Sequence, residues 1–353
     1  MRRMQSVGVS AVLAATLLLG CGGEEKPPPV SEPQVSPQCD SPTEYLAFDP
    51  ANSAPQELRL QRIDDILALF DAATANVAVA GDKAAQALAL YQGSEARLRA
   101  DVQGRMDLRS SPALLVGPEL DATLTGAIED LRKATTAYQA RVARQRLVTS
   151  GFSRFLYLSV MEELLTAPSR EHYDQAYGYL GTGRTNAEAG RRSFARMATE
   201  RDATNETALA PDLFALVISG ACTLDGALEY LGKDSMEVEE DEPYARLTRM
   251  MDARLQLILV YSLSHELFAY TRVPTDAQAA QLALIGADGL LRTLEPSLQQ
   301  SGQERIALAH DLREALDAAL AASRPDDPAW IPAFKAQEFL DRIQASWFID
   351  VKG

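Results

Sequence analysis

The sequence has few of the residues that usually build catalytic or metal sites. It contains three histidines, three cysteines and two tryptophans among 353 residues. The spacings H-E-x-x-H, C-x-x-C and G-x-S-x-G do not occur, and no glycine-rich phosphate loop is present. The enzymes that rely on these motifs are therefore poor models for the chain, and no catalytic residue is assigned.

Alternating patterns typical of β-strands are also scarce, and apolar residues recur instead at spacings of three and four. One such stripe consists of Leu60, Ile63, Ile66, Leu67 and Phe70. Similar stripes lie in residues 120–147, 152–165, 211–231, 244–270, 276–294, 303–322 and 332–348. The periodicity predicts an all-α fold, a bundle of roughly eight to ten helices in a single domain.

Basic residues are fewer than acidic ones. The chain has 34 Lys and Arg against 49 Asp and Glu, for a formal net charge of −15. A surface of this sign repels phosphate, so we expect no nucleic-acid partner. It would attract metal cations, although solubility is a sufficient explanation for it. The acidic run 237–242 lacks the pattern of an EF-hand loop and is interpreted as the solvated start of a helix, where it complements the helix dipole.

The N-terminus carries an apolar run, residues 7–19, after the basic pair Arg2 and Arg3. The run is short for a bilayer span and has the layout of a secretory signal over residues 1–20. It ends in Leu18-Leu19-Gly20-Cys21, which resembles the bacterial lipobox. The resemblance implies a lipoprotein that is cleaved before Cys21 and held on a lipid bilayer by acyl chains such as palmitate. The alternatives are an ordinary signal peptide and an uncleaved N-terminal anchor.

The residues after Cys21 bear on location and spacing. Gly22 replaces the Asp that marks inner-membrane retention in many lipoproteins, so we expect attachment to the outer membrane in preference to the inner, within the bacterial cell envelope. Residues 21–55 are rich in proline, which fixes φ and lacks an N–H, and they predict an extended tether in the periplasm. Residues 56–353 would then form the helical domain.

Two cysteines remain after lipidation, Cys39 in the tether and Cys222 in an apolar stretch. In an oxidising compartment such a pair favours a disulfide. Closing so long a loop stabilises the folded state by about 4–5 kcal/mol in the chain-entropy model. The alternative is that Cys222 is a small core residue and Cys39 a free thiol.

The stretch "SREHYDQAYGYLGTG", residues 169–183, is the richest in polar and aromatic side chains. Ser169 is a predicted N-cap, and the glycines at 181 and 183 predict the end of the helix. Tyr173, Ala176, Tyr177 and Leu180 are predicted to face the core, His172, Gln175 and Tyr179 to form a more polar stripe, and Asp174 to share a third side with Gly178. This stretch is the best candidate for a site.

The preceding helix is apolar nearly all round yet carries Glu162 and Glu163. At least one of these glutamates is expected to face the interior and to need a polar partner, supplied by His172, Tyr173 or Tyr177 across the short turn. The candidate ligand-binding residues are therefore Glu162, Glu163, His172, Asp174, Tyr177 and Tyr179.

The segment "HYDQAYGYLG", residues 172–181, resembles the H-W-D-E-A-Y/F-G-Y-L/F-G signature of helical, often lipid-anchored envelope proteins related to the imelysins. The resemblance implies an all-α envelope protein and an association with the uptake of iron or another metal. Tyr173 replaces the Trp and Gln175 the acidic residue, which removes a potential metal ligand. The imelysin motif G-x-H-x-x-E is absent, because Gln175, Phe268 and Arg313 follow His172, His265 and His310 at that spacing.

Two functions fit these observations. The first is a membrane-anchored envelope lipoprotein that acts as a binding module for a divalent metal ion, iron or a small ligand, in uptake. The second is a helical scaffold that binds an envelope protein and has no small-molecule site. A hydrolase acting through a carboxylate–histidine site is disfavoured because its motif is missing, and a lone histidine on a helix is usually structural.

Overall fold

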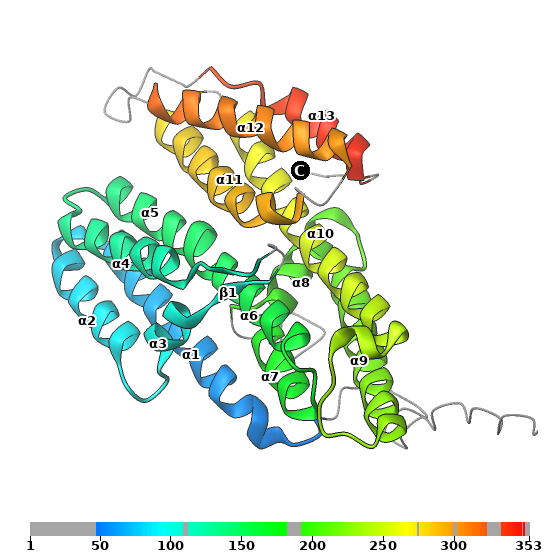
Figure 1. Ribbon diagram of the computed structural model, residues 1–353. Coiled ribbons are helices and arrows are strands. Elements are labelled where there is room, and N and C mark those ends of the chain that lie inside the picture. Colours follow the sequence, from blue (N-terminus) through cyan, green and yellow to red (C-terminus); the bar gives the residue numbers. More distant parts are fainter. Residues whose placement is uncertain are drawn as a thin grey trace, which may run out of the picture. The chain divides into compact units, whose positions relative to one another are not determined.

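The computed structural model describes residues 47–108, 112–181, 192–273, 275–298, 302–322, 333–347 and 349, all within the unit Val35–Gly353. These residues form an all-α multi-helix bundle, as the periodicity predicts (Figure 1). The predicted signal at residues 1–20 and most of the predicted tether lie outside the described residues. Cys21 and Cys39 lie outside them as well.

The helices of the N-terminal half alternate with short turns. They are α1 (Pro50–Ala75), α2 (Ala80–Gln92), α3 (Leu98–Gly104), α4 (Gly117–Lys133), α5 (Ala137–Arg146), α6 (Ser153–Leu165) and α7 (Arg170–Leu180). A π-helical turn, Leu147–Phe152, joins α5 to α6, and a 3₁₀ turn, Val77–Val79, precedes α2. Two short antiparallel strands, β1 (Met106–Asp107) and β2 (Leu114–Leu115), lie between α3 and α4.

The helices of the C-terminal half are longer on average. They are α8 (Phe194–Asn205), α9 (Leu209–Leu231), α10 (Glu242–Arg272), α11 (Ala277–Leu298), α12 (Gln303–Ala321) and α13 (Ala336–Trp347). A 3₁₀ turn, Val238–Glu240, precedes α10. The longest helix, α10, packs against both α9 and α11, whereas α1 packs against α2, α5 and α7 (Figure 1).

The predicted stripe on α1 is confirmed. Leu60, Ile63, Ile66, Leu67 and Phe70 are all buried in the apolar core. The predicted helix over residues 120–147 is divided by a break after Lys133. The hydroxyl of Thr136 accepts a hydrogen bond from the Gln139 N–H and so begins α5 as a separate helix.

The tether ends earlier than predicted, because α1 begins at Pro50 and continues through Pro55. Asp49 caps the helix by accepting a hydrogen bond from the Ala51 N–H at 2.9 Å. Pro50 costs little at the first helical position, since the N–H that it lacks has no helical partner there, whereas Pro55 lies inside the helix. The prediction of an extended chain up to residue 55 is therefore wrong for the last six residues.

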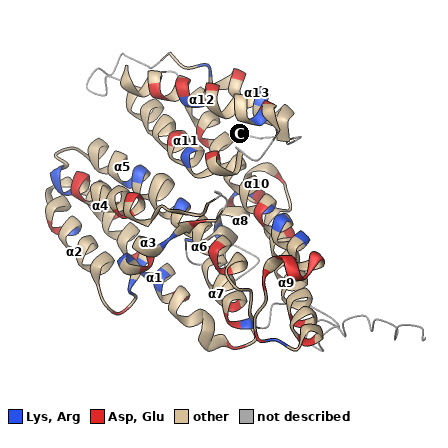
Figure 2. Ribbon diagram, viewed as in Figure 1, with Lys and Arg blue, Asp and Glu red and all other residues tan. Residues whose placement is uncertain are grey.

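The acidic run before α10 has the predicted role. Asp241 is the N-cap, and its carboxylate accepts a hydrogen bond from the Tyr244 N–H at 2.7 Å. Over the described helices, acidic and basic positions are interspersed (Figure 2). In the described part of the chain, α9 is the one helix long and apolar enough to cross a membrane, and half of its most apolar window is buried within the domain.

Candidate functional site

Helix α7 carries the candidate residues, and its ends are as predicted. The Ser169 hydroxyl accepts a hydrogen bond from the His172 N–H at 3.1 Å, which caps the first turn. The helix ends at Leu180, and Gly181 follows with φ of 85°, a backbone conformation that favours glycine.

The predicted faces of α7 are partly wrong. Tyr173, Ala176 and Leu180 are buried as expected. Tyr179, which was expected on the more polar stripe, is wholly buried, whereas Tyr177 is half-buried. The reason is that α7 packs against α1, α6 and α9, so more than one of its sides faces a neighbouring helix.

Tyr179 belongs to a polar cluster centred on Arg105, at the C-terminal end of α3. We call this group the Arg105 cluster; it consists of Arg59, Asp101, Arg105, Glu162, Glu163, His172 and Tyr179. The Arg105 side chain is only 6% exposed. Its Nη1 lies 3.3 Å from Glu162 Oε2 and 3.6 Å from Glu163 Oε1, and its Nη2 lies 2.5 Å from Asp101 Oδ1. A buried guanidinium therefore faces three carboxylates.

The Tyr179 hydroxyl joins the two arginines to one of these carboxylates. It accepts hydrogen bonds from Arg59 Nη1 at 2.6 Å and from Arg105 Nη2 at 3.1 Å, and it donates to Asp101 Oδ2. Burial raises the pKa of Tyr179, so the phenol stays protonated and keeps its donor role.

Glu162 and Glu163 of α6 both have polar partners, as their burial requires. His172 Nδ1 lies 2.7 Å from Glu163 Oε2, which confirms the predicted contact across the turn between α6 and α7. The hydrogen bond to Glu163 raises the pKa of His172. Glu162 Oε2 accepts a hydrogen bond from the Met106 N–H at 3.1 Å. Burial raises the pKa of Glu162, and the charge of Arg105 opposes that rise.

Asp174 lies outside the Arg105 cluster. Its carboxylate, fully buried, accepts hydrogen bonds from the Phe48 N–H at 3.0 Å, the Asp49 N–H at 2.8 Å and Asn52 Nδ2 at 3.0 Å. It fixes the start of α1. Tyr177 packs against the apolar core. Of the six predicted residues, Glu162, Glu163, His172 and Tyr179 therefore come together, and Asp174 and Tyr177 do not join them.

The Arg105 cluster has the composition of an ion-pair network. Among the described residues, no three His, Cys, Asp or Glu side chains are grouped so that they would hold a metal ion. In the cluster the carboxylates face guanidinium groups, which supply the positive charge that a cation would otherwise bring. The described geometry therefore does not favour a metal ion as the ligand of these candidate binding residues.

A cavity of about 310 Å³ opens onto the cluster. Its lining consists of Arg59, Arg97, Ala100, Asp101, Gly104, Arg105 and Glu162. Arg97 is exposed and precedes α3 with a left-handed φ of 52°. Arg105 Nε is buried and has no hydrogen-bond acceptor among the residues that the structure describes. Sequence reasoning missed these arginines, and the one signal for them is Asp101 placed four residues before Arg105.

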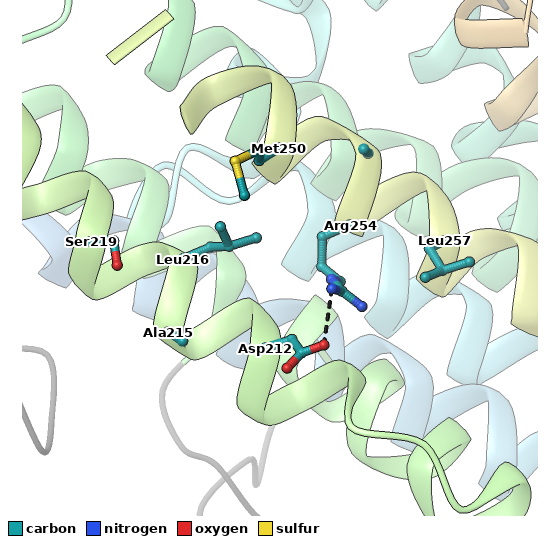
Figure 3. Close-up of a pocket in the computed structure, with 8 residues that line it drawn as sticks. Asp212, Ala215, Leu216, Ser219, Met250, Arg254 and Leu257 are labelled. Carbon is teal, nitrogen blue, oxygen red and sulfur yellow. Dashed lines mark ion pairs between the residues drawn. The ribbon is translucent and has the colours of Figure 1, made fainter. Parts of the chain in front are cut away.

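A second, open groove of about 500 Å³ is lined by residues of the packed helices α9 and α10 (Figure 3). Asp212 and Arg254 form an ion pair of 2.9 Å in it. Leu216 and Leu257 contribute apolar walls, and Met250 is 47% exposed. The groove shares no residue with the Arg105 cluster.

No protein-family model, curated protein or solved structure matches the chain. The resemblances to the lipobox and to the imelysin signature therefore stay predictions. Cys222 lies half-buried on α9, and the predicted disulfide also stays a prediction because its other half, Cys39, lies outside the described residues.

Proposed function

We propose that this chain is a lipid-anchored protein of the bacterial envelope whose helical domain binds a small organic anion in the cavity beside Arg105. The observation that carries the proposal is the cavity lining, in which three arginines, Arg59, Arg97 and Arg105, outnumber the carboxylates of Asp101 and Glu162. On a chain with a net charge of −15, a lining with excess positive charge is a local exception.

Two guanidinium groups in this lining have hydrogen-bonding capacity to spare. Arg105 Nε is buried and has no hydrogen-bond partner among the described residues. A buried polar atom of that kind is costly unless a ligand or water satisfies it. Arg97 makes no hydrogen bond or ion pair with another described residue. A ligand carboxylate or phosphate would accept hydrogen bonds from such guanidinium groups with strong, charge-assisted geometry.

The proposed lipid anchor is supported by the lipobox-like sequence ending at Cys21 and by the proline-rich residues that follow. Two or three acyl chains would hold the domain on a membrane almost irreversibly. Mass spectrometry of the mature N-terminus tests this part of the proposal. We expect an acylated Cys21 and loss of membrane association in Cys21→Ala; retention of that variant in the membrane fraction would overturn the anchor.

The predicted disulfide fits the course of the chain at the start of the domain. The Arg170 guanidinium lies 5.9 Å from the centre of the Phe48 ring, and its Nε lies 2.6 Å from Asp225 Oδ1 on α9. Asp225 is one turn after Cys222, about 5 Å along the helix axis. Phe48 is nine positions after Cys39, a span of about 30 Å at full extension, so Cys222 would be within reach.

Anion binding is tested on the purified domain with acetate, succinate, citrate and inorganic phosphate. We expect at least one of them to raise the melting temperature, and Arg97→Gln to weaken its binding by about tenfold or more, as loss of a charge-assisted hydrogen bond does. Arg132→Gln, an exposed arginine of α4, is the matched control and should bind as the wild type does. If none of the anions shifts the wild-type melting temperature, the proposal fails.

The same assay with iron, copper, zinc and calcium addresses the metal-binding version of this function. The described residues supply no three-ligand site for it. A metal-specific rise in melting temperature that survives Arg97→Gln would favour the metal version over the anion.

The alternative is a helical scaffold of the envelope with no small-molecule site. The observation in its favour is the α9–α10 groove, where Met250 and Leu216 present apolar surface (Figure 3). A scaffold predicts no response to any small anion. It also predicts that Met250→Asp abolishes association with a stoichiometric envelope protein, while Arg97→Gln leaves that association intact.

A further inference from the structure

A separate cleft lies where α1, α5, α10 and α11 meet, with a volume of about 460 Å³. The charged and amide side chains of its lining are Asp71, Arg141, Arg144, Gln145 and Glu266. None of these residues belongs to the Arg105 cluster. The cleft is therefore independent of the cavity on which the proposed function rests.

Glu266 is the acidic group on the inner side of this cleft. Its Oε1 accepts a hydrogen bond from Gln145 Nε2 at 2.9 Å. Within the described part of the chain, no hydrogen bond or ion pair reaches Oε2. The side chain is half-buried, and burial raises its pKa to about 7. A carboxylate in that setting gains from a partner that satisfies its second oxygen.

The position of this carboxylate is fixed by a close approach of α11. A Cβ at Gly286 would lie 2.2 Å from Gln145 Nε2 and 2.5 Å from Glu266 Cδ, so a larger residue there would push these two side-chain ends aside. The side chains of Gln145 and Glu266 are thus confined between α5, α10 and α11. Such confinement preorganises a binding group before a ligand arrives.

The exposed side of the cleft carries the opposite charge. Arg144 is already paired, since its guanidinium contacts the carboxylate of Asp71 with Nη2 at 3.3 Å from Oδ2. Arg141 is exposed, and its contact with a described side chain is a long hydrogen bond of 3.4 Å to Gln278. Within its lining, the cleft therefore presents one acidic group without an ion-pair partner, Glu266, and one basic group without such a partner, Arg141; Arg192 and Arg201 act on Glu266 from outside the lining.

The remaining wall is aliphatic. Ala269 on α10, Val273 just after it, and Leu282 and Ala283 on α11 line the cleft without polar side-chain atoms. With Glu266 ionised, the two carboxylates and two guanidinium groups of the lining sum to zero charge. A ligand that complements such a lining is neutral overall, with its charges separated and an apolar body between or beside them.

We infer that this cleft is a binding site for a small zwitterion with an aliphatic body, of which a free aliphatic amino acid is the simplest example. Its ammonium group would donate to Glu266 Oε2. Its carboxylate would accept from Arg141. Its side chain would pack on the wall formed by Ala269, Val273 and Leu282.

Isothermal titration calorimetry with the whole soluble domain tests the inference, with L-leucine as the first probe and the other common amino acids in turn. The comparison probes are isoamylamine, which is leucine without its carboxylate, and 4-methylpentanoate, which is leucine without its ammonium group. We expect at least one aliphatic amino acid to bind. Each comparison probe should bind more weakly by about tenfold or more, since each lacks one charge-assisted contact.

Two variants assign the binding to this cleft. Glu266→Gln removes the charge while keeping the shape and the contact with Gln145, and it should weaken binding by about tenfold or more. Arg141→Gln should weaken binding of the amino acid but not of isoamylamine. Glu229→Gln, an exposed glutamate of α9, is the control and should change nothing. Circular dichroism establishes that each variant is folded.

Two outcomes would overturn the inference: no amino acid binds the folded wild type, or Glu266→Gln binds as tightly as the wild type does. Binding that persists in Arg97→Gln and is lost in Glu266→Gln separates this site from the anion cavity. The two proposals can therefore fail independently.

Discussion

The carboxylate of Asp174 on α7 accepts a hydrogen bond from the backbone N–H of Asp49, at 2.8 Å, and this contact joins two residues 125 positions apart. Phe48 and Asn52 donate to the same carboxylate. A residue expected to bind a ligand thus holds the first turn of α1 in place.

Asp174→Asn should destabilise the domain by about 2–3 kcal/mol, because the amide loses the charge and turns a donor toward backbone donors. Chemical denaturation with urea measures the change. Glu171→Gln, at an exposed position of the same helix, should cost no more than about 0.5 kcal/mol. Equal effects of the two substitutions would contradict the structural role of Asp174.

Tyr179→Phe removes the hydroxyl that links Arg59, Arg105 and Asp101. We expect a loss of about 1–3 kcal/mol in the free energy of unfolding, since buried charged groups each lose one partner. Tyr230→Phe, at a residue 58% exposed, is the control and should be neutral. A Tyr179→Phe variant as stable as the wild type would show that the cluster does not depend on the hydroxyl.

The contact between His172 and Glu163 should make stability depend on pH. The pKa of His172 is raised in the folded state by the hydrogen bond to Glu163, so its contribution is fully present below the unfolded value of 6.5. That contribution is lost as pH rises through the folded-state pKa.

Urea denaturation at a series of pH values should therefore show the largest deficit of His172→Gln below pH 6.5 and a shrinking deficit above it. His310→Gln, at an exposed position of α12, is the comparison variant and is measured over the same pH series. A deficit of His172→Gln that is constant with pH would mean that the charge of the histidine contributes nothing.

Glu266 should also make stability fall as pH rises, in this case because burial disfavours its charged form. Its pKa is raised from 4.5 to about 7, so between these values the folded state binds more protons than the unfolded state and stability falls as pH rises. The full shift corresponds to about 3 kcal/mol above pH 7. Its charged neighbours are Arg192, Arg201, Asp71 and Arg144, and His265, with its pKa lowered to about 4, is neutral in this range.

Glu266→Gln should consequently equal or exceed the wild type in stability at pH 8 and lose that advantage near pH 5. Denaturation of both proteins at the two pH values measures the difference. In the binding assay, affinity for the amino acid should fall as pH drops below 7, because proton uptake by Glu266 competes with the ammonium group. A Glu266→Gln variant less stable at pH 8 than at pH 5, relative to the wild type, would contradict the raised pKa.

If Cys39 and Cys222 form the proposed disulfide, the unfolded, unreduced protein should take up no alkylating reagent at either residue. Reduction should expose both thiols and lower the free energy of unfolding by about 4–5 kcal/mol in the chain-entropy model. Mass spectrometry after alkylation gives the count. Cys222→Ser should reproduce the loss without reductant, and free thiols in the untreated protein would exclude the pairing.

The helical class and the burial of α1 follow from the sequence because the period of three to four residues records which side faces the core. Leu60, Ile63 and Phe70 are buried as that period requires. The helix starts at Ser169 and Asp241 are predictable for a similar reason, since capping depends on neighbours in the chain.

The composition of the site was harder to predict. Helix α3 is short and has no clear stripe, and the one local signal for Arg105 is Asp101, four residues before it. The partners of Glu162 come from 56 or 57 residues away, a relationship that no local pattern encodes. On α7, three neighbouring helices bury several sides at once, which is why Tyr179 and Asp174 are buried against the expectation from a single stripe.

The hydrogen bonds that Asp174 accepts from the amides of Phe48 and Asp49 have a mechanical consequence if the domain is tethered through the preceding chain. Tension transmitted along the preceding chain would act on α1 at its N-terminal end and would load these two hydrogen bonds together with the packing of Ala47 and Phe48 against the core. In a Cys222→Ser variant, which lacks the proposed disulfide, the resistance of the domain to pulling from its N-terminal side would then depend strongly on this one carboxylate.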